Sequence, residues 1–158
     1  MLEVFREVEA ATVSLSLHNP GFFFPVPGMM MKHWEPRPMP MDLISDRFNY
    51  QRALSAARRA QAKAMSAGRA YVDYWVARLE FAVGYLDTIA AVHQAASAEA
   101  AAKRAEALRA AKAALETARR ALETYAHVAR DQSDRGAIAV LNEYVYRPLK
   151  MKVADLEK

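Results

Sequence analysis

Residues 69–96 read RAYVDYWVARLEFAVGYLDTIAAVHQAA, and this stretch decides the fold. It contains no proline, and apolar side chains occupy most of the circumference of the helix that it predicts. A helix that is apolar nearly all round must be buried on several sides, so other elements have to surround it. The stretch therefore predicts the central helix of an all-α protein.

Three acidic residues, Asp73, Glu80 and Asp87, recur every seven positions along this helix. A seven-residue step places successive carboxylates on one edge, ~10 Å apart along the axis. That separation is too large for a catalytic acid–base pair made by neighbouring members. Two interpretations stay open. The edge can be paired with arginines such as Arg58 or Arg119, or it can be an acidic strip that docks a partner or ligand.

A second helix is expected before the central one, with Asp42 or Ser45 as its cap. One continuous helix over 43–96 would be ~80 Å long, which is too long for a compact domain. Glycine commonly stops a helix, so we expect a turn at Ser66–Gly68.

A third helix is expected to begin after a Ser97 cap. Its apolar residues repeat every seven positions, as in a coiled-coil seam. They are Ala101, Leu108, Leu115, Leu122 and Ala129. Ala111, Ala118 and Tyr125 are expected to fill the alternate core positions.

The stretch RDQSDRG, residues 130–136, breaks the third helix, and Ser133 or Asp134 can cap the last one. Pro148 should kink this last helix near Tyr144. Four long helices joined by short connections favour antiparallel neighbours. The expected architecture is therefore an antiparallel up-down helical bundle of about four long helices.

The N-terminal part of the chain has a different composition. Residues 2–17 predict a short amphipathic element, whose last part could equally be extended. Six of the seven prolines fall in 19–41, together with aromatic residues and methionines. We interpret 19–41 as a strap packed across an apolar surface, although an exposed loop for a partner or membrane is the alternative. Residues 1–41 are thus expected to be a segment added to a bundle over 42–158, and the two parts together to form a single domain.

The composition excludes several classes of function. Twenty-two basic and 18 acidic residues leave a net charge of +4, too small an excess to predict nucleic-acid binding. The chain has no cysteine, and no histidine follows a glutamate by three positions, so neither a thiolate site nor a di-iron bundle is expected. We predict no metal and no cofactor. The methionines of the strap are interpreted as core filling.

Targeting signals are also missing from the sequence pattern. The acidic start MLEVFREVEA does not resemble a signal peptide, and no uncharged apolar stretch reaches the ~18 residues of a membrane span. The compartment stays open.

The aromatic residues suggest a second candidate site. Trp75 and Tyr85 of the central helix, together with Trp34 of the strap, could line a pocket for a small ligand. Aromatic residues at helical spacing are also typical of a plain core, which is the alternative interpretation.

Two segments carry a resemblance to a known family. They are ALSAARRAQAKAMSAGRAYVDYWVARLEFAVGYLDTIAAV, residues 53–92, and GAIAVLNEYVYRPLKMKV, residues 136–153. Over about 42–158 the chain resembles the C-terminal helical domain of large bacterial multidomain glycoside-hydrolase-like proteins of the α-glucuronidase type. In those proteins the catalytic carboxylates lie on a separate barrel domain, so the resemblance implies no catalytic residue here. It implies an accessory role beside a catalytic domain, or in dimerisation.

We therefore expect a non-catalytic helical accessory or interaction domain that is part of, or a partner to, a carbohydrate-processing protein. A protein partner or self-association is expected, and carbohydrate would be reached only through a linked catalytic domain. The alternatives are a free-standing bundle for oligomerisation or adaptor functions, and a bundle that binds a small ligand.

Overall fold

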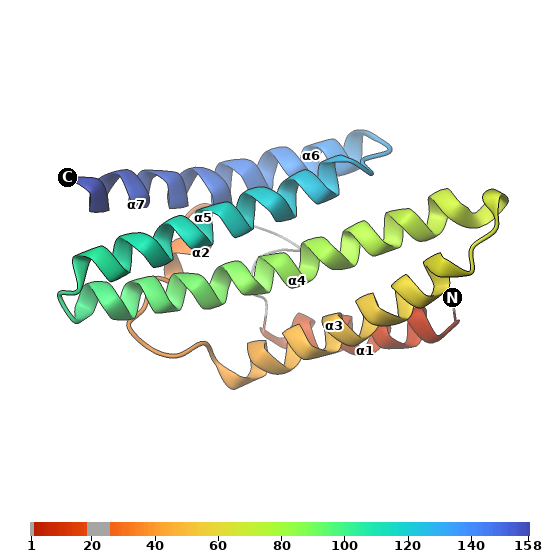
Figure 1. Ribbon diagram of the computed structural model, residues 1–158, viewed down its shortest axis with the longest axis horizontal. Coiled ribbons are helices and arrows are strands. Elements are labelled where there is room, and N and C mark those ends of the chain that lie inside the picture. The colour runs from red at the N-terminus through yellow and green to blue at the C-terminus, as the bar shows by residue number, and fades with distance from the viewer. Residues whose placement is uncertain (1, 19–25) are drawn as a thin grey trace.

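The computed structural model describes residues 2–18 and 26–158, and every regular element within these ranges is helical. The longest helix is α4, Ser66–Ala100. Figure 1 shows α4 in the middle, with α1 and α3 on one side and α5 and α7 on the other. The predictions of an all-α protein and of a central helix are confirmed.

The burial of α4 explains its central position. Leu86, Ile89 and Val92 have no exposed area, and Tyr85 is only 2% exposed. Burial of such side chains on several faces stabilises a helix that could not persist alone in water. The aromatic stretch at 69–96 is therefore the core of the molecule.

Two helices cover the first side of α4. Helix α1, Leu2–His18, runs antiparallel to α3, Met41–Ala62, and buries Val4 and Ala11 against the core. Ion pairs Glu3–Arg59 at 2.5 Å and Glu7–Arg52 at 2.7 Å join the two helices. The helix continues to His18, so the alternative of an extended end to this element is not formed.

The second side of α4 is covered by α5, Arg104–Ala126. The predicted leucine seam is only half buried. The fully buried face contains the expected core positions Ala111, Ala118 and Tyr125, which are confirmed, and also Ala107, Ala114 and Ala121. Alanine lets two helices approach closely, and the leucines lie at the edges of that contact.

The helix boundaries differ from the predicted ones at two turns. The first turn is at residues 63–65, so Ser66 and Gly68 lie inside α4. Ser97 also lies inside α4 and caps nothing, because the alanines after it continue the helix. The chain turns only at Ala102, which has φ 56°. The Ala102 and Lys103 amides donate to the carbonyls of residues 99 and 98, the Schellman pattern.

The last helical segment consists of α6, Gln132–Leu141, a π-helical turn, Asn142–Tyr146, and α7, Arg147–Glu157. The side chain of Asp131 caps α6, which corrects the expectation of Ser133 or Asp134. The π-helical turn includes Tyr144, the position at which Pro148 is expected to distort the helix.

The described part of the strap is packed and contains the short helix α2, Met29–Lys32. Met30 has no exposed area, and Met31, Trp34 and Met39 pack against the core. The phenylalanines at 22–24 lie outside the described residues.

The finer prediction, an up-down bundle of four helices, is not confirmed. Helix α3, with α1 packed on it, covers one side of α4. Helix α5, with α7 packed on it, covers the other side. No strand occurs within 2–18 or 26–158.

Candidate functional site

The three carboxylates of α4 are paired within the chain. Asp87 pairs with Arg47 of α3, and the Glu80 carboxylate accepts from Arg58 at 2.9 Å. Asp73 accepts from Gln61 at 2.7 Å, and Arg69 adds an ion pair at 3.1 Å. These contacts align α3 along one edge of α4. A role of the strip in docking a partner stays a prediction.

The three predicted pocket aromatics do not lie together. Trp75 and Tyr85 are ten positions apart on α4, a distance of ~15 Å along the axis. The Trp75 ring meets Phe5 edge-on at 5.6 Å between centroids. Tyr85 is enclosed, and burial raises the pKa of its hydroxyl. The aromatics of α4 therefore act mainly as core.

Trp34 lies near the other end of α4. Its indole nitrogen donates to Glu99 at 2.6 Å, and Lys152 of α7 donates to the same carboxylate at 2.7 Å. The Lys152 ammonium also lies over the Trp34 ring, 4.8 Å from its centroid. Burial raises the pKa of Glu99, but the hydrogen bonds from Lys152 and Trp34 outweigh it and lower that pKa. This contact fastens the strap to α4 and α7.

A buried carboxylate, which the sequence pattern marks only as a cap candidate, holds the other end of the molecule. Asp134 is 6% exposed and accepts from the Tyr125 hydroxyl at 2.7 Å and from the Tyr74 hydroxyl at 3.2 Å. The Arg130 amide donates to it at 2.9 Å, and the Arg78 guanidinium lies 3.8 Å away.

The hydrogen bonds and ion pair around Asp134 hold helices together and do not form a proton-transfer site. Burial raises the pKa of Asp134, whereas the Arg130 amide and both tyrosines lower it, with lowering as the net result. Arg78 also donates to the Tyr125 hydroxyl, so the guanidinium, the hydroxyl and the Asp134 carboxylate are all paired within the network. An ionised carboxylate with this many partners has no proton to exchange near neutral pH, and the network instead joins α4, α5 and α6.

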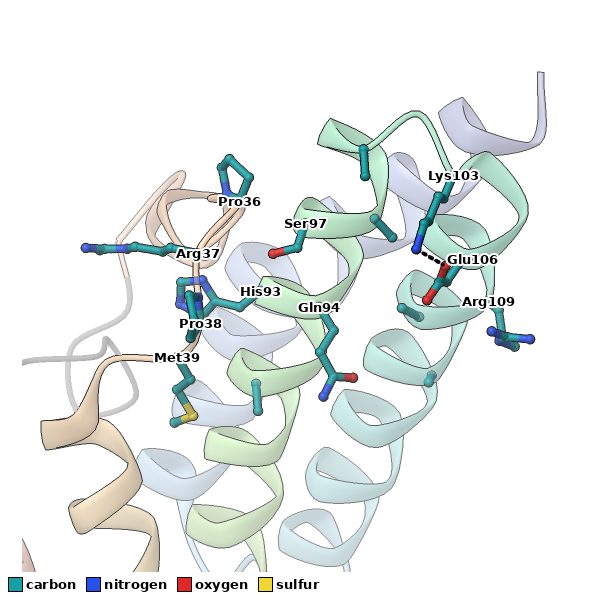
Figure 2. Close-up of a pocket in the computed structure, with 15 residues that line it drawn as sticks. Pro36, Arg37, Pro38, Met39, His93, Gln94, Ser97, Lys103, Glu106 and Arg109 are labelled. Carbon is teal, nitrogen blue, oxygen red and sulfur yellow. Dashed lines mark ion pairs between the residues drawn. The ribbon is translucent and has the colours of Figure 1, made fainter.

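A groove of about 740 Å³ lies between the strap, the end of α4 and the start of α5. Figure 2 shows Pro36–Met39 on one side, Gln94 and Ser97 of α4 in the middle, and Arg109 of α5 beyond them. Between these polar groups its lining is alanine, namely Ala90, Ala98, Ala101, Ala110 and Ala113. We call this feature the α4–α5 groove.

The charges around the α4–α5 groove favour an anionic neighbour. Lys103 and Glu106 form an ion pair at 3.5 Å, and Arg37 pairs with Glu35 at 2.5 Å. Arg109 has no carboxylate partner within the described ranges. One guanidinium without a carboxylate partner in the described ranges, that of Arg109, therefore lies at the α5 edge of the groove.

His93 supports the strap side of the groove. It is 1% exposed, and its Nδ1 lies 3.2 Å from the Glu35 carbonyl oxygen, to which it can donate. The His33 ring meets it edge-on at 5.8 Å. The Nε2 atom is buried and has no hydrogen-bond partner among the described residues, and His93 is one of the residues that line the groove.

Other site classes find no support in the described ranges. No three histidine, aspartate or glutamate side chains there are grouped to hold a metal ion. None of the described helices is both long and apolar enough to cross a bilayer.

No protein-family model, curated protein or solved structure matches this chain.

Proposed function

We propose that this chain is a non-catalytic helical interaction module whose α4–α5 groove binds an amphipathic helix of a partner protein. The observation that carries the proposal is that the groove lies on the same edge of α4 that α3 contacts, beyond the start of α3. The heptad edge of α4 predicts where the partner helix lies. The lining of the groove predicts which side chains that helix carries.

The position follows from the heptad edge of α4. Asp73, Glu80 and Asp87 contact α3, and the next positions on that edge are Gln94 and Ala101, both of which line the groove. Because α3 begins at Met41 and Arg47 already reaches Asp87, no helix of the described chain covers the edge beyond it. A partner helix would lie along α4 beyond the start of α3, between the strap and α5.

The shape and charge of the groove describe the helix that fits it. Alanine side chains leave hollows that receive larger apolar side chains, as in helix-in-groove recognition. The free guanidinium of Arg109 favours a glutamate or aspartate beside those apolar side chains. The expected ligand is therefore a helix with leucine-like residues on one face and acidic residues next to them.

The kind of protein that provides this helix is a separate question. A carbohydrate-processing partner follows from the family resemblance alone and stays a prediction. The proposal that the groove binds a helix does not depend on any contact with a carbohydrate.

Fluorescence anisotropy tests the proposal with a defined probe. The probe is a fluorescein-labelled peptide of about 18 residues designed as a helix, with leucines on one face and flanking glutamates, and the comparison peptide carries lysines in place of the glutamates. We expect saturable binding of the acidic peptide only. Arg109→Glu should weaken it about tenfold or more, because the charge facing the peptide is reversed.

Lys150→Glu is the matched control. Lys150 is an exposed cation of α7 outside the groove, so this variant has the same charge change without the contact. If both peptides bound equally, or if Lys150→Glu weakened binding as much as Arg109→Glu, the groove proposal would be wrong.

A further inference from the structure

His93 has one unpaired polar atom at the strap side of the α4–α5 groove. Its side chain is 1% exposed, and within the described ranges its Nε2 atom has no hydrogen-bond partner. His93 also lines the groove, and Figure 2 shows its ring reaching from α4 toward the strap. A buried polar atom without a partner is uncommon in a folded protein, because nothing replaces its lost contact with water. The Nε2 atom therefore marks a position where a bound molecule can supply the missing partner.

The Glu35 carbonyl determines which kind of partner Nε2 needs. A carbonyl oxygen only accepts hydrogen bonds, so the Nδ1 atom of His93, 3.2 Å away, carries the ring proton. In a neutral imidazole the other nitrogen is then an acceptor. The Nε2 atom thus requires a molecule with an N–H or O–H group.

The strap beside His93 does not supply that donor. Residues 36–40 read PRPMP, and proline has no backbone N–H. The Arg37 amide already donates to the Glu35 carbonyl at 2.8 Å. Residues 36–38 are exposed, so a ligand can reach Nε2 by shifting this stretch without opening the core.

Ser97 places a second hydrogen-bonding group next to His93. The two residues are four positions apart on α4, so their side chains lie on the same face, one turn apart. Ser97 lines the groove, and Figure 2 shows its oxygen pointing toward the strap. Its hydroxyl takes part in no hydrogen bond within the described part of the chain, so it is available as a donor.

We infer that His93 and Ser97 form a subsite for a carboxamide, the side-chain group of glutamine and asparagine, on the bound helix. The inference rests on the helix-binding function proposed for the groove. The carboxamide N–H donates to Nε2 of His93, and its oxygen accepts from the Ser97 hydroxyl. A carboxylate has no proton to donate to Nε2, and an ammonium would lose its hydration in a groove that already holds the Arg109 guanidinium.

The two edges of the groove then recognise different flanks of one helix. Arg109 lies at the α5 edge and favours acidic residues there, whereas the His93–Ser97 subsite faces the strap. The expected helix carries leucine-like residues between a glutamate flank and a glutamine flank. This difference also sets the direction of the helix, because a reversed helix with its leucines against α4 would exchange the two flanks.

Fluorescence anisotropy with two peptides tests the subsite. Both peptides have about 18 residues, the same leucine face and the same glutamate flank, and their other flank carries glutamines in one and methionines in the other. Methionine has nearly the length and shape of glutamine but no amide. The wild-type chain should bind the glutamine peptide about threefold to tenfold more tightly, the range expected for one neutral hydrogen bond.

Three variants assign this preference to its atoms. His93→Leu removes the acceptor and should abolish the preference for glutamine, and Ser97→Ala should lessen it. His127→Leu is the matched control, at an exposed histidine after α5 that lies outside the groove, and should keep the full preference. Circular dichroism and thermal unfolding establish that each variant is folded.

Nitrogen-15 NMR of the histidine rings gives the same information without a substitution. The free chain should show His93 with its proton on Nδ1, and the Nε2 resonance should move with the glutamine peptide and not with the methionine peptide. Equal affinities of the two peptides for the wild type, or a preference that His93→Leu leaves intact, would overturn the inference and leave helix binding in the groove standing. A proton on Nε2 in the free chain would do the same. If neither peptide bound, the inference and the proposed function would both be wrong.

Discussion

Gly84 of α4 lies so close to α5 that a Cβ atom added to it would be 3.0 Å from the Cβ of Ala121. The two helices approach through small residues on both sides, and Ala118 and Tyr125 flank this contact on α5. The close packing of α4 on α5 positions the alanine floor of the groove at the other end of the same helix pair.

This contact predicts the effect of a methyl group at Gly84. Alanine favours a helix over glycine by about 1 kcal/mol, so Gly84→Ala should stabilise the chain if space were free. We expect it to destabilise instead, because Ala121 cannot move without α5. Ala121→Gly in the same chain should recover about 1 kcal/mol in a double-mutant cycle measured by urea unfolding. A stabilised Gly84→Ala single variant would contradict the packing.

The buried Asp134 carboxylate predicts a large loss of stability on truncation. Asp134→Ala leaves the Tyr125 and Tyr74 hydroxyls without their shared acceptor and removes the carboxylate that pairs with Arg78, which should cost about 2–4 kcal/mol. Ser133→Ala is the control. Ser133 is exposed and caps nothing, so its truncation should stay within about 0.5 kcal/mol in the same urea unfolding measurement.

Glu99 predicts part of the response to acid. Hydrogen bonds from Lys152 and Trp34 outweigh burial and lower its pKa below the ordinary 4.5 in the folded chain. The folded state therefore gains stability from Glu99 above that pH, and loses it as the pH falls through the lower folded pKa. Thermal unfolding between about pH 6 and about pH 2 should show a smaller acid loss for Glu99→Gln than for the wild type. Equal losses would contradict the assignment.

Ala102 predicts a stabilising substitution. It has φ 56°, a conformation that costs an L-residue about 1 kcal/mol and glycine nothing. Ala102→Gly should raise the free energy of unfolding by up to about 1 kcal/mol. Ala101→Gly, one residue earlier at φ −82°, lacks this strain and should stabilise nothing. Thermal unfolding of the two variants compares them directly.

The central helix is predictable from the sequence because its signal is strong. A stretch that is apolar on nearly every face can only be buried, and α4 is. Helix boundaries are harder to predict. Ser97 has the right chemistry for a cap, yet helix formation continues to Ala100, and the turn is made by Ala102, a residue with no turn preference of its own.

The candidate sites depend on contacts that periodicity cannot show. The heptad spacing of Asp73, Glu80 and Asp87 is visible in the sequence. What the pattern cannot show is that α3 begins near Asp87, which leaves Gln94 in an open groove. Asp134 is visible only as a cap candidate, because periodicity does not reveal that tyrosines of α4 and α5 converge on it.

A backbone amide NMR titration shows most directly whether a partner helix binds the α4–α5 groove. Addition of the acidic peptide to the ¹⁵N-labelled chain should shift the amides of residues 90–113 and of the strap around Arg37. The amides of α1 and of the exposed face of α3 around Phe48 should stay unchanged. Shifts confined to α3, or no shifts at a peptide concentration of about 1 mM, would refute binding in the groove.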